Sequence, residues 1–268
     1  MATIAITGSA SGIGAATRAR AEAAGDTVIG VDLRDAEVTA DLSTADGRER
    51  AVAEVLERAE GALDGLVTCA GVSAPVPADT TVRVNWWGTR AFLDGCREAL
   101  AAGADVAHVC AVSSHAPTIT PNTPVDLIDA CLADDEDQAI AILGAMDDVQ
   151  AMSFAYAASK MAVARYVRTQ APTEQWAGAG IRLNAIAPGP IQTPLLQAGL
   201  DDETFGEFIG MLPVPVGDYG TADQIAAWIE MMMSPAADFM CGSMVFVDGG
   251  TDALLRGNDW PARFESGG

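Results

Sequence analysis

The opening segment of the chain, a short apolar run followed by closely spaced glycines, constrains the fold more than any other feature. Residues 2–7 form the apolar run, glycines stand at positions 8, 12 and 14, and an alanine-rich helical stretch continues to about Ala24. A second apolar run from Thr27 to Val31 ends on Asp32. This order predicts a strand, a tight turn, a helix and another strand. Glycines in such a turn let the backbone approach a pyrophosphate held at the helix N-terminus.

The same alternation of strands and helices continues along the chain. We expect strands at 63–69, 105–112, 181–187 and 243–247, and helices at 44–60, 80–102, 152–171 and 222–233. Elements that alternate at this spacing predict an α/β fold with a doubly wound parallel sheet, which binds ligands at the carboxyl ends of its strands. No linker or internal repeat divides the chain, so we expect one domain over residues 1–268 with an irregular tail at about 251–268.

Residues 116–150 interrupt this alternation just before the segment that carries Tyr156. Three prolines precede two apolar stretches, and acidic residues at 134–137 separate those stretches. We interpret the segment as an insertion of one or two short helices with an acidic joint.

Composition narrows the classes of function. The formal net charge is −22, so the chain should repel nucleic acid and anionic membranes. No run of about 18 apolar residues exists and the N-terminus lacks a basic leader, so we expect neither a membrane span nor a signal peptide. Five scattered cysteines without C-x-x-C spacing indicate reduced thiols in a cytoplasmic protein, and two histidines make a histidine-based metal site unexpected.

A tyrosine and the only lysine of the chain stand four residues apart, at Tyr156 and Lys160. On a helix these positions share one face about 6 Å apart, so an ammonium can lie beside a phenol. A cation at that distance favours phenolate over phenol, which moves the pKa of a tyrosine from about 10 toward the working range of a general acid and base. The alternative is a solvated lysine on a helix surface.

Asp32 ends the second strand, 18 residues beyond Gly14. A carboxylate there accepts hydrogen bonds from an adenosine ribose and repels a 2′-phosphate, which predicts NAD rather than NADP, with Arg34 as the one counter-indication. Asp41 and Leu42 are candidates for the adenine edge, although Asp41 also fits an acidic residue placed before a helix N-terminus.

Several residues near the strand ends allow two interpretations. Ser114 can hydrogen-bond a carbonyl oxygen or serve as a turn residue. Asn85 is unfavourable inside a helix, so it either has an unusual role or caps or kinks the chain. The pair Trp86-Trp87 fits a core contact better than a ligand contact. A hydrolase built on Ser114 and His115 is disfavoured, because no G-x-S-x-G elbow is present.

Taken together, these motifs resemble the classical short-chain dehydrogenase/reductase family. The matching pieces follow the family's order over nearly the whole chain: Thr7-Gly-x-x-x-Gly12-Ile-Gly14, Ala70-Gly71, Asn85, Ser114, Tyr156-x-x-x-Lys160, Asn184-x-x-x-Pro188-Gly189-x-x-x-Thr193 and Val247-Asp-Gly-Gly250. The resemblance implies a Rossmann-like fold, a nicotinamide cofactor and an Asn–Ser–Tyr–Lys catalytic tetrad, and from the composition we expect no metal.

The resemblance also implies a role for each member of the tetrad. Tyr156 would be the acid and base, and Lys160 would lower its pKa while touching the nicotinamide ribose. Ser114 would orient the carbonyl, and Asn85 would hold a proton-relay water. The expected NAD contacts are Gly8, Ser11, Gly12, Ile13, Asp32, Asp41, Leu42, Ala70, Gly71, Tyr156, Lys160, Pro188, Gly189, Ile191 and Thr193, the last two at the carboxamide.

The chain departs from the family pattern in two places. Thr68-Cys69-Ala70-Gly71 replaces the usual Asn-Asn-Ala-Gly, so a backbone-bracing asparagine is missing. Ser114 and Tyr156 are 42 positions apart where about a dozen is usual, so the insertion adds roughly 30 residues. Because the helix that follows commonly builds the family's oligomer interface, we expect a homo-oligomer, with the usual tetramer in doubt.

A closer likeness is to the bacterial branch of the family that comprises hydroxysteroid dehydrogenases and carbonyl reductases. It is carried by the insertion and by segments at 32–44, 193–200 and 233–237. The region 190–216 is apolar, with Leu195, Leu196, Phe205, Phe208, Ile209, Met211 and Leu212. We therefore expect NAD-dependent interconversion of an alcohol and a ketone on a hydrophobic, alicyclic, steroid-like substrate. A terpenoid or aromatic substrate, and a non-catalytic NAD-binding regulator, are the alternatives.

Overall fold

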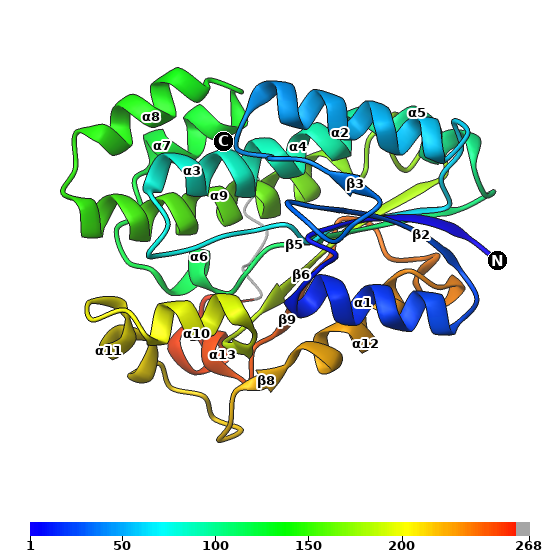
Figure 1. Ribbon diagram of the computed structural model, residues 1–268. Coiled ribbons are helices and arrows are strands. Elements are labelled where there is room, and N and C mark those ends of the chain that lie inside the picture. Colours follow the sequence, from blue (N-terminus) through cyan, green and yellow to red (C-terminus); the bar gives the residue numbers. More distant parts are fainter. Residues whose placement is uncertain (261–268) are drawn as a thin grey trace, which may run out of the picture.

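The computed structural model describes residues 1–260, and its centre is a parallel β-sheet (Figure 1). Within these residues the sheet has seven strands in the order β3-β2-β1-β4-β5-β6-β9. The strands are β1 (Thr3–Thr7), β2 (Thr27–Asp32), β3 (Val38–Thr39), β4 (Gly65–Thr68), β5 (Ala107–Val112), β6 (Ile181–Pro188) and β9 (Met244–Val247). The doubly wound parallel sheet is confirmed, and β3 is an addition that the sequence pattern did not indicate.

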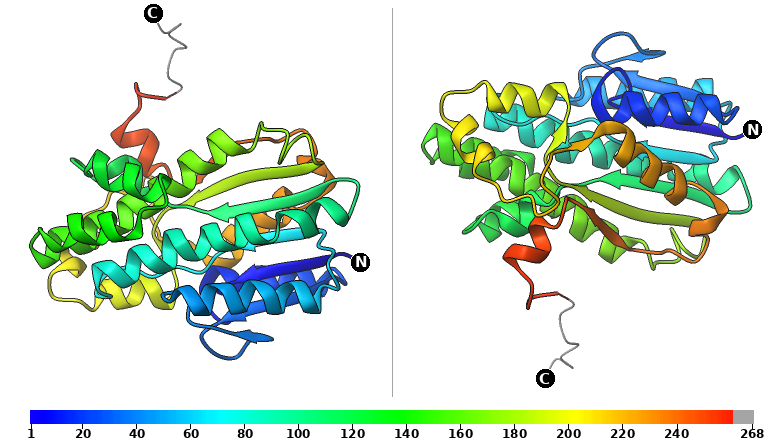
Figure 2. Two further views of the ribbon diagram at one scale, coloured as in Figure 1. Left: turned by 90° about the horizontal axis from the view of Figure 1, so that it is seen from above. Right: turned by 90° about the horizontal axis from the view of Figure 1, so that it is seen from below.

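Helices cover both faces of the sheet (Figure 2). The central strands β4 and β5 are buried along their whole length, as strands must be when both faces are covered. One face carries α1 (Gly12–Ala23) and α12 (Ala222–Met232), which pack on each other. The other carries α2 (Ala45–Arg58), α4 (Thr89–Gly95), α5 (Arg97–Ala102) and α9 (Asp148–Gln170).

The long helix expected at 80–102 is not one regular α-helix. It consists of α3 (Ala78–Val82), the π-helical segment η1 (Arg83–Gly88), α4 and α5. The π-helical segment holds Asn85, whose side chain bonds to the backbone of Val72 instead of pointing to solvent. A π-helical segment widens the helix, so this one turns Asn85 toward Val72, which supports the interpretation of Asn85 as a residue with an unusual role.

The insertion forms short helices that all pack on α9, the last two of them lying side by side above it in Figure 1. They are α6 (Ala116–Ile119), α7 (Val125–Leu132) and α8 (Glu136–Gly144). The two helices expected on either side of an acidic joint are therefore present, with α6 in addition. Asp135 in the joint caps α8, because its side chain accepts a hydrogen bond from the Gln138 N–H.

The C-terminal region corrects the expectation of an irregular tail. Helix α13 (Thr251–Leu255) begins the segment. Asp252 is buried and accepts hydrogen bonds from Thr118 of α6 and from Arg256. Thr118 is distant in the sequence, so the pattern of residues around Thr251 did not indicate that this segment is held as a helix. The rest of the expected tail, 261–268, lies outside the described residues.

Small elements complete the region between β6 and β9. They are β7 (Ile191–Gln192), α10 (Pro194–Leu200), α11 (Phe205–Gly210), β8 (Gly220–Thr221) and the 3-10 turn η2 (Pro235–Ala237). Strands β7 and β8 pair in parallel and hold the ends of the α10–α11 segment together. The segment at 214–216 packs on the turn that precedes α13, where the Val216 N–H donates to the Gly249 carbonyl oxygen.

Candidate active site

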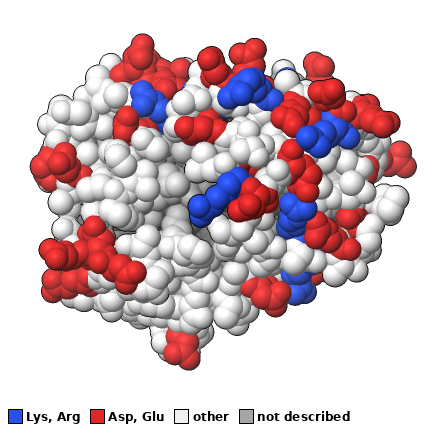
Figure 3. Space-filling view, viewed as in Figure 1, with Lys and Arg blue, Asp and Glu red and all other residues white. Residues whose placement is uncertain are grey.

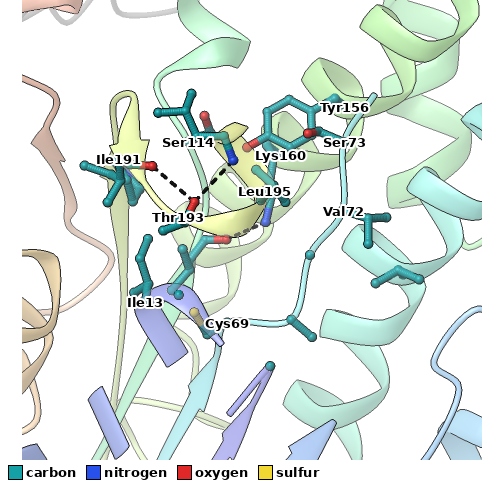
Figure 4. A pocket seen from close by; sticks show the side chains of 18 of the residues that line it. Ile13, Cys69, Val72, Ser73, Ser114, Tyr156, Lys160, Ile191, Thr193 and Leu195 are labelled. Carbon is teal, nitrogen blue, oxygen red and sulfur yellow. Dashed lines mark hydrogen bonds between the residues drawn. The ribbon is translucent and has the colours of Figure 1, made fainter. Parts of the chain in front are cut away.

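A cavity of about 1130 Å³ lies at the carboxyl ends of the strands, where parallel sheets bind ligands. Every residue expected to contact NAD lines it, as do Ser114, Tyr156 and Lys160 of the tetrad. Figure 4 shows that these side chains come from different elements and converge on one space. In the face shown in Figure 3, acidic side chains lie mainly around the periphery, and the hollow left of the centre is largely uncharged, with a basic and an acidic side chain on its right.

The glycine turn packs so closely on neighbouring backbone that side chains would collide there. Gly8 has a φ of +70°, and a Cβ on it would lie 2.8 Å from the Ala70 backbone. A Cβ on Gly14 would overlap the carbonyl oxygen of Gly8. The bare backbone thus packs closely at the N-terminus of α1, where helix N–H groups are available to an anion. The geometry fits a dinucleotide pyrophosphate.

Asp32 stands at the end of β2 with its carboxylate held by the backbone. One carboxylate oxygen accepts from the Ala10 N–H at 3.0 Å, and the other accepts from the Leu33 N–H at 2.7 Å. The exposed Arg34 also lines the cavity. Asp32, which favours NAD, and Arg34, which would favour NADP, therefore both line this cavity.

Asp41 is held at the start of α2 by a local turn. Its carboxylate accepts hydrogen bonds from the backbone N–H and the hydroxyl of Ser43, which lower its pKa. This arrangement favours the interpretation of Asp41 as an acidic residue before a helix. Leu42 is buried at the cavity wall and faces Gly88.

Tyr156, Ser114 and Lys160 meet at the cavity wall (Figure 4). Burial raises the pKa of Tyr156, and a side-chain hydrogen bond with Ser114 lowers it in part. Ser114 follows β5, and its Oγ also accepts from the Ala116 N–H at 3.1 Å. The Ser114 hydroxyl is therefore oriented by the first turn of the insertion.

Lys160 is buried and donates to the Val112 carbonyl oxygen at 2.8 Å. Burial lowers its pKa to about 8. Burial is the main cause of the raised pKa of Tyr156, and the expected lowering effect of the Lys160 ammonium on that phenol stays a prediction.

Asn85 is the one tetrad residue that does not line the cavity. It is fully buried, its Oδ1 accepts from the Val72 N–H at 2.8 Å, and its Nδ2 donates to the Val72 carbonyl oxygen at 2.9 Å. Nδ2 also lies 3.4 Å from the Oγ of Ser159, next to Lys160. Asn85 therefore holds one wall of the cavity to the helix that carries Tyr156 and Lys160.

The apolar part of the cavity wall comes mainly from α10 and α11. Six of the seven apolar residues singled out from the sequence line the cavity: Leu195, Leu196, Phe205, Phe208, Ile209 and Leu212. Met211 is the exception, because its side chain is 63% exposed on the outer side of the segment. The sequence reasoning missed Ile119 and Met152, which also line the cavity. Their positions close to Ser114 and Tyr156 could have indicated them, since Ile119 lies in α6, just after Ser114, and Met152 lies one helical turn before Tyr156.

His115 lines the cavity but does not form a pair with Ser114. Its Nδ1 lies 3.5 Å from a carboxylate oxygen of Asp248, and both side chains are buried. This contact and backbone N–H donors lower the pKa of Asp248 against the opposing effect of burial. The geometry agrees with the exclusion of a Ser–His hydrolase.

All five cysteines are free. Among residues 1–260, no group of histidine, cysteine and acidic side chains is arranged to hold a metal ion. No helix in that part of the chain is both long and apolar enough to cross a membrane. Trp86 and Trp87 are buried away from the cavity, which favours their interpretation as core residues.

The chain belongs to the short-chain dehydrogenase/reductase family, a class of oxidoreductases whose fold and site it shares. A family model described as "Enoyl-(Acyl carrier protein) reductase" matches residues 138–252. The 3-alpha-hydroxysteroid dehydrogenase/carbonyl reductase of Comamonas testosteroni is 43% identical over 96% of this chain and 98% of its own length. The cis-4-hydroxycyclohexanecarboxylate dehydrogenase of Sinomonas cyclohexanicum is 33% identical over 93% of this chain and 96% of its own length.

A solved structure agrees with these relatives. The 3-alpha-hydroxysteroid dehydrogenase from Pseudomonas sp. B-0831, complexed with NADH, superposes with a TM-score of 0.91. It is 44% identical and covers 96% of this chain and 100% of its own. The resemblance inferred from the sequence motifs, including the hydroxysteroid dehydrogenase branch, is confirmed.

Proposed function

We propose that this chain is an NAD-dependent oxidoreductase that interconverts a secondary alcohol and a ketone on a hydrophobic, alicyclic, steroid-like substrate. The observation that carries the proposal is one cavity with two unlike halves. A glycine turn and Asp32 form one half, and the apolar side chains of α10 and α11 form the other. Tyr156 and Ser114 also line this cavity, as the chemistry requires.

The residues fit a dinucleotide along one wall of the cavity. The bare glycine backbone at the N-terminus of α1 would hold the pyrophosphate, and Asp32 would accept from the adenosine ribose hydroxyls. Ile191 and Thr193 would hold the carboxamide, and Lys160 would hold the nicotinamide ribose. When bound, NADH supplies a hydride to the carbonyl carbon, and NAD accepts one from the alcohol in the reverse direction.

The chain's own contribution is to hold the substrate oxygen and move one proton. In reduction, the Tyr156 phenol donates its proton to the oxygen, and the Ser114 hydroxyl donates a hydrogen bond to the same atom. In oxidation, the Tyr156 oxygen takes the proton back. The raised pKa of Tyr156 keeps the phenol protonated at neutral pH, so the acid is ready for the reductive direction.

The remaining parts of the proposal concern domain organisation, location and assembly. We propose one domain, a cytoplasmic location and a homo-oligomer. Five free cysteines without a disulfide support a reducing compartment. A mass measurement in solution tests the assembly.

A substrate panel tests the reaction. Purified protein is mixed with NAD and with steroid, terpenoid and simple cyclic alcohols, and NADH formation is followed by absorbance. We expect the highest kcat/KM for a 3-hydroxysteroid. The absence of NADH formation with every alcohol, despite measurable NAD binding, would favour the non-catalytic regulator instead.

A further inference from the structure

The insertion contacts the π-helical segment η1 through hydrogen bonds as well as through apolar packing. The indole N–H of Trp86 donates to the Cys131 carbonyl oxygen in α7 at 2.7 Å. The indole N–H of Trp87 donates to the Asp134 carboxylate, in the joint between α7 and α8, at 2.9 Å. Both indoles are buried, so these bonds are directional links between the insertion and η1.

An acidic residue at the start of α8 links the insertion to both η1 and α2. The carboxylate of Glu136 accepts from Arg83 of η1 and from Arg48 of α2, at 2.8 Å each. Arg48 is buried and also lies 3.3 Å from the Leu42 carbonyl oxygen at the cavity wall. One carboxylate of the insertion thus joins η1 to the wall expected to hold the adenine. Of the two pairs, the one with Arg48 is the better shielded, because the Arg48 side chain is only 10% exposed, and shielded charge-assisted bonds are stronger than ordinary surface pairs.

The opposite side of the same π-helical segment carries Asn85. Its side chain holds the backbone of Val72 and approaches Ser159. The Ser159 hydroxyl donates in turn to the Tyr156 carbonyl oxygen at 2.9 Å. A continuous series of contacts therefore leads from the insertion, through η1 and Asn85, to the cavity wall and the helix that carries Tyr156.

π-helical segments are rare and occur mostly as single turns inside α-helices, frequently at functional sites. We propose that the insertion is a brace that fixes the position of Asn85, with Asp134 and Glu136 as its positioning residues. The proposal rests on the proposed function, in which the cavity holds the reacting groups. The insertion thus fixes the position of an active-site residue through contacts that lie outside the cavity.

Two pairs of variants test the brace. Asp134 has a φ of +63°, so Asp134→Gly removes the acceptor without backbone strain, and Asp134→Asn keeps an acceptor at the same place. Glu136→Ala removes the carboxylate between the two arginines. Its matched control is Glu54→Ala, because Glu54 pairs with Arg58 on the exposed surface of α2.

The kinetic readout separates positioning from general loss of structure. Asp134→Gly and Glu136→Ala should lower kcat between about 5- and 50-fold, with the KM for NAD within about twofold, because small displacements at a reacting centre have effects of this order. The primary deuterium isotope effect on kcat should rise. In an Asn85→Ala background the same changes should have little further effect, since both act through one residue. Asp134→Asn and Glu54→Ala should match the unmodified protein.

Amide hydrogen exchange at Val72 provides a readout that does not depend on activity. Its N–H is bonded to the side chain of Asn85, so Asp134→Gly and Glu136→Ala should lower its protection by about tenfold or more while thermal unfolding stays cooperative. Unchanged exchange at Val72 in both variants, or kcat losses that add fully to that of Asn85→Ala, would overturn the proposal. If the unmodified protein oxidises no alcohol but Val72 responds as expected, the brace stands and the proposed reaction fails.

Discussion

Lys160 is the only lysine of the chain and one of its most deeply placed charges. Burial lowers its pKa from 10.5 to about 8, with a smaller opposing effect from Cys69. A lysine whose pKa falls on folding loses its proton first in the folded state. Between these two pKa values the unfolded chain therefore binds more protons, and the contribution of Lys160 to stability rises with pH.

The size of this contribution follows from the two pKa values. Relative to neutral pH, Lys160 should add about 1.4 kcal/mol to the free energy of unfolding at about pH 9, and about 2 kcal/mol at about pH 9.5. Burial raises the pKa of the Cys96 thiol from 9.0 to about 12, and it also raises the pKa of the buried Cys110 and Cys131 thiols. These thiols act in the opposite direction, lowering stability as pH rises above their unfolded pKa, so the Lys160 effect must be isolated.

The difference between the protein and Lys160→Met isolates it, because both contain the same thiols and phenols. Urea unfolding at a series of pH values should show the free energy of unfolding of the unmodified protein rising relative to that of the variant from about pH 8 upward. A single lysine also gives a single side-chain resonance after isotopic labelling, so NMR titration reads its pKa directly. A titration midpoint near 10.5, or a stability difference that stays flat with pH, would refute the reasoning.

Three further perturbations test other parts of the site. Tyr156→Phe removes the proton donor, so turnover should fall by about 10²- to 10⁴-fold while NAD affinity in a fluorescence titration is retained. The protein should prefer NAD to NADP in steady-state kinetics, and Asp32→Ser should narrow that preference; a native preference for NADP would contradict the assignment. Gly14→Ala should destabilise by about 1–3 kcal/mol or abolish NAD binding, because its methyl meets the Gly8 carbonyl. A Cβ on Gly144 faces open space, so the control Gly144→Ala should leave both the thermal stability and the NAD affinity unchanged when each is measured by calorimetry.

The parts of the fold set by local chemistry were predictable from the sequence. The glycine turn, the apolar strands and Asp32 at the end of β2 follow from residue types that act over a few neighbouring positions. The spacing of Tyr156 and Lys160 likewise placed both on one helix face, and the structure brings both to the cavity.

The parts set by distant contacts were not predictable. Asn85 appeared to lie in a continuous helix, yet its amide bonds to Val72, 13 positions away. Met211 belongs to the apolar segment of the cavity but faces outward. The pKa of Tyr156 depends on how deeply its phenol is buried, a quantity that the four-residue spacing to Lys160 does not contain.

Helix α9 connects the insertion to the residues of the active site. Helix α9 presents Tyr156 and Lys160 to the cavity, while α6, α7 and α8 pack along it within the chain. Side chains along α9, including Ala151, Ala155 and Val163, are buried in the core that also contains residues of the insertion. The surface of α9 that α6–α8 cover is not open to a second subunit, so the proposed homo-oligomer would use other surfaces. The proposed brace and this expected change of interface would both follow from packing against the same helix.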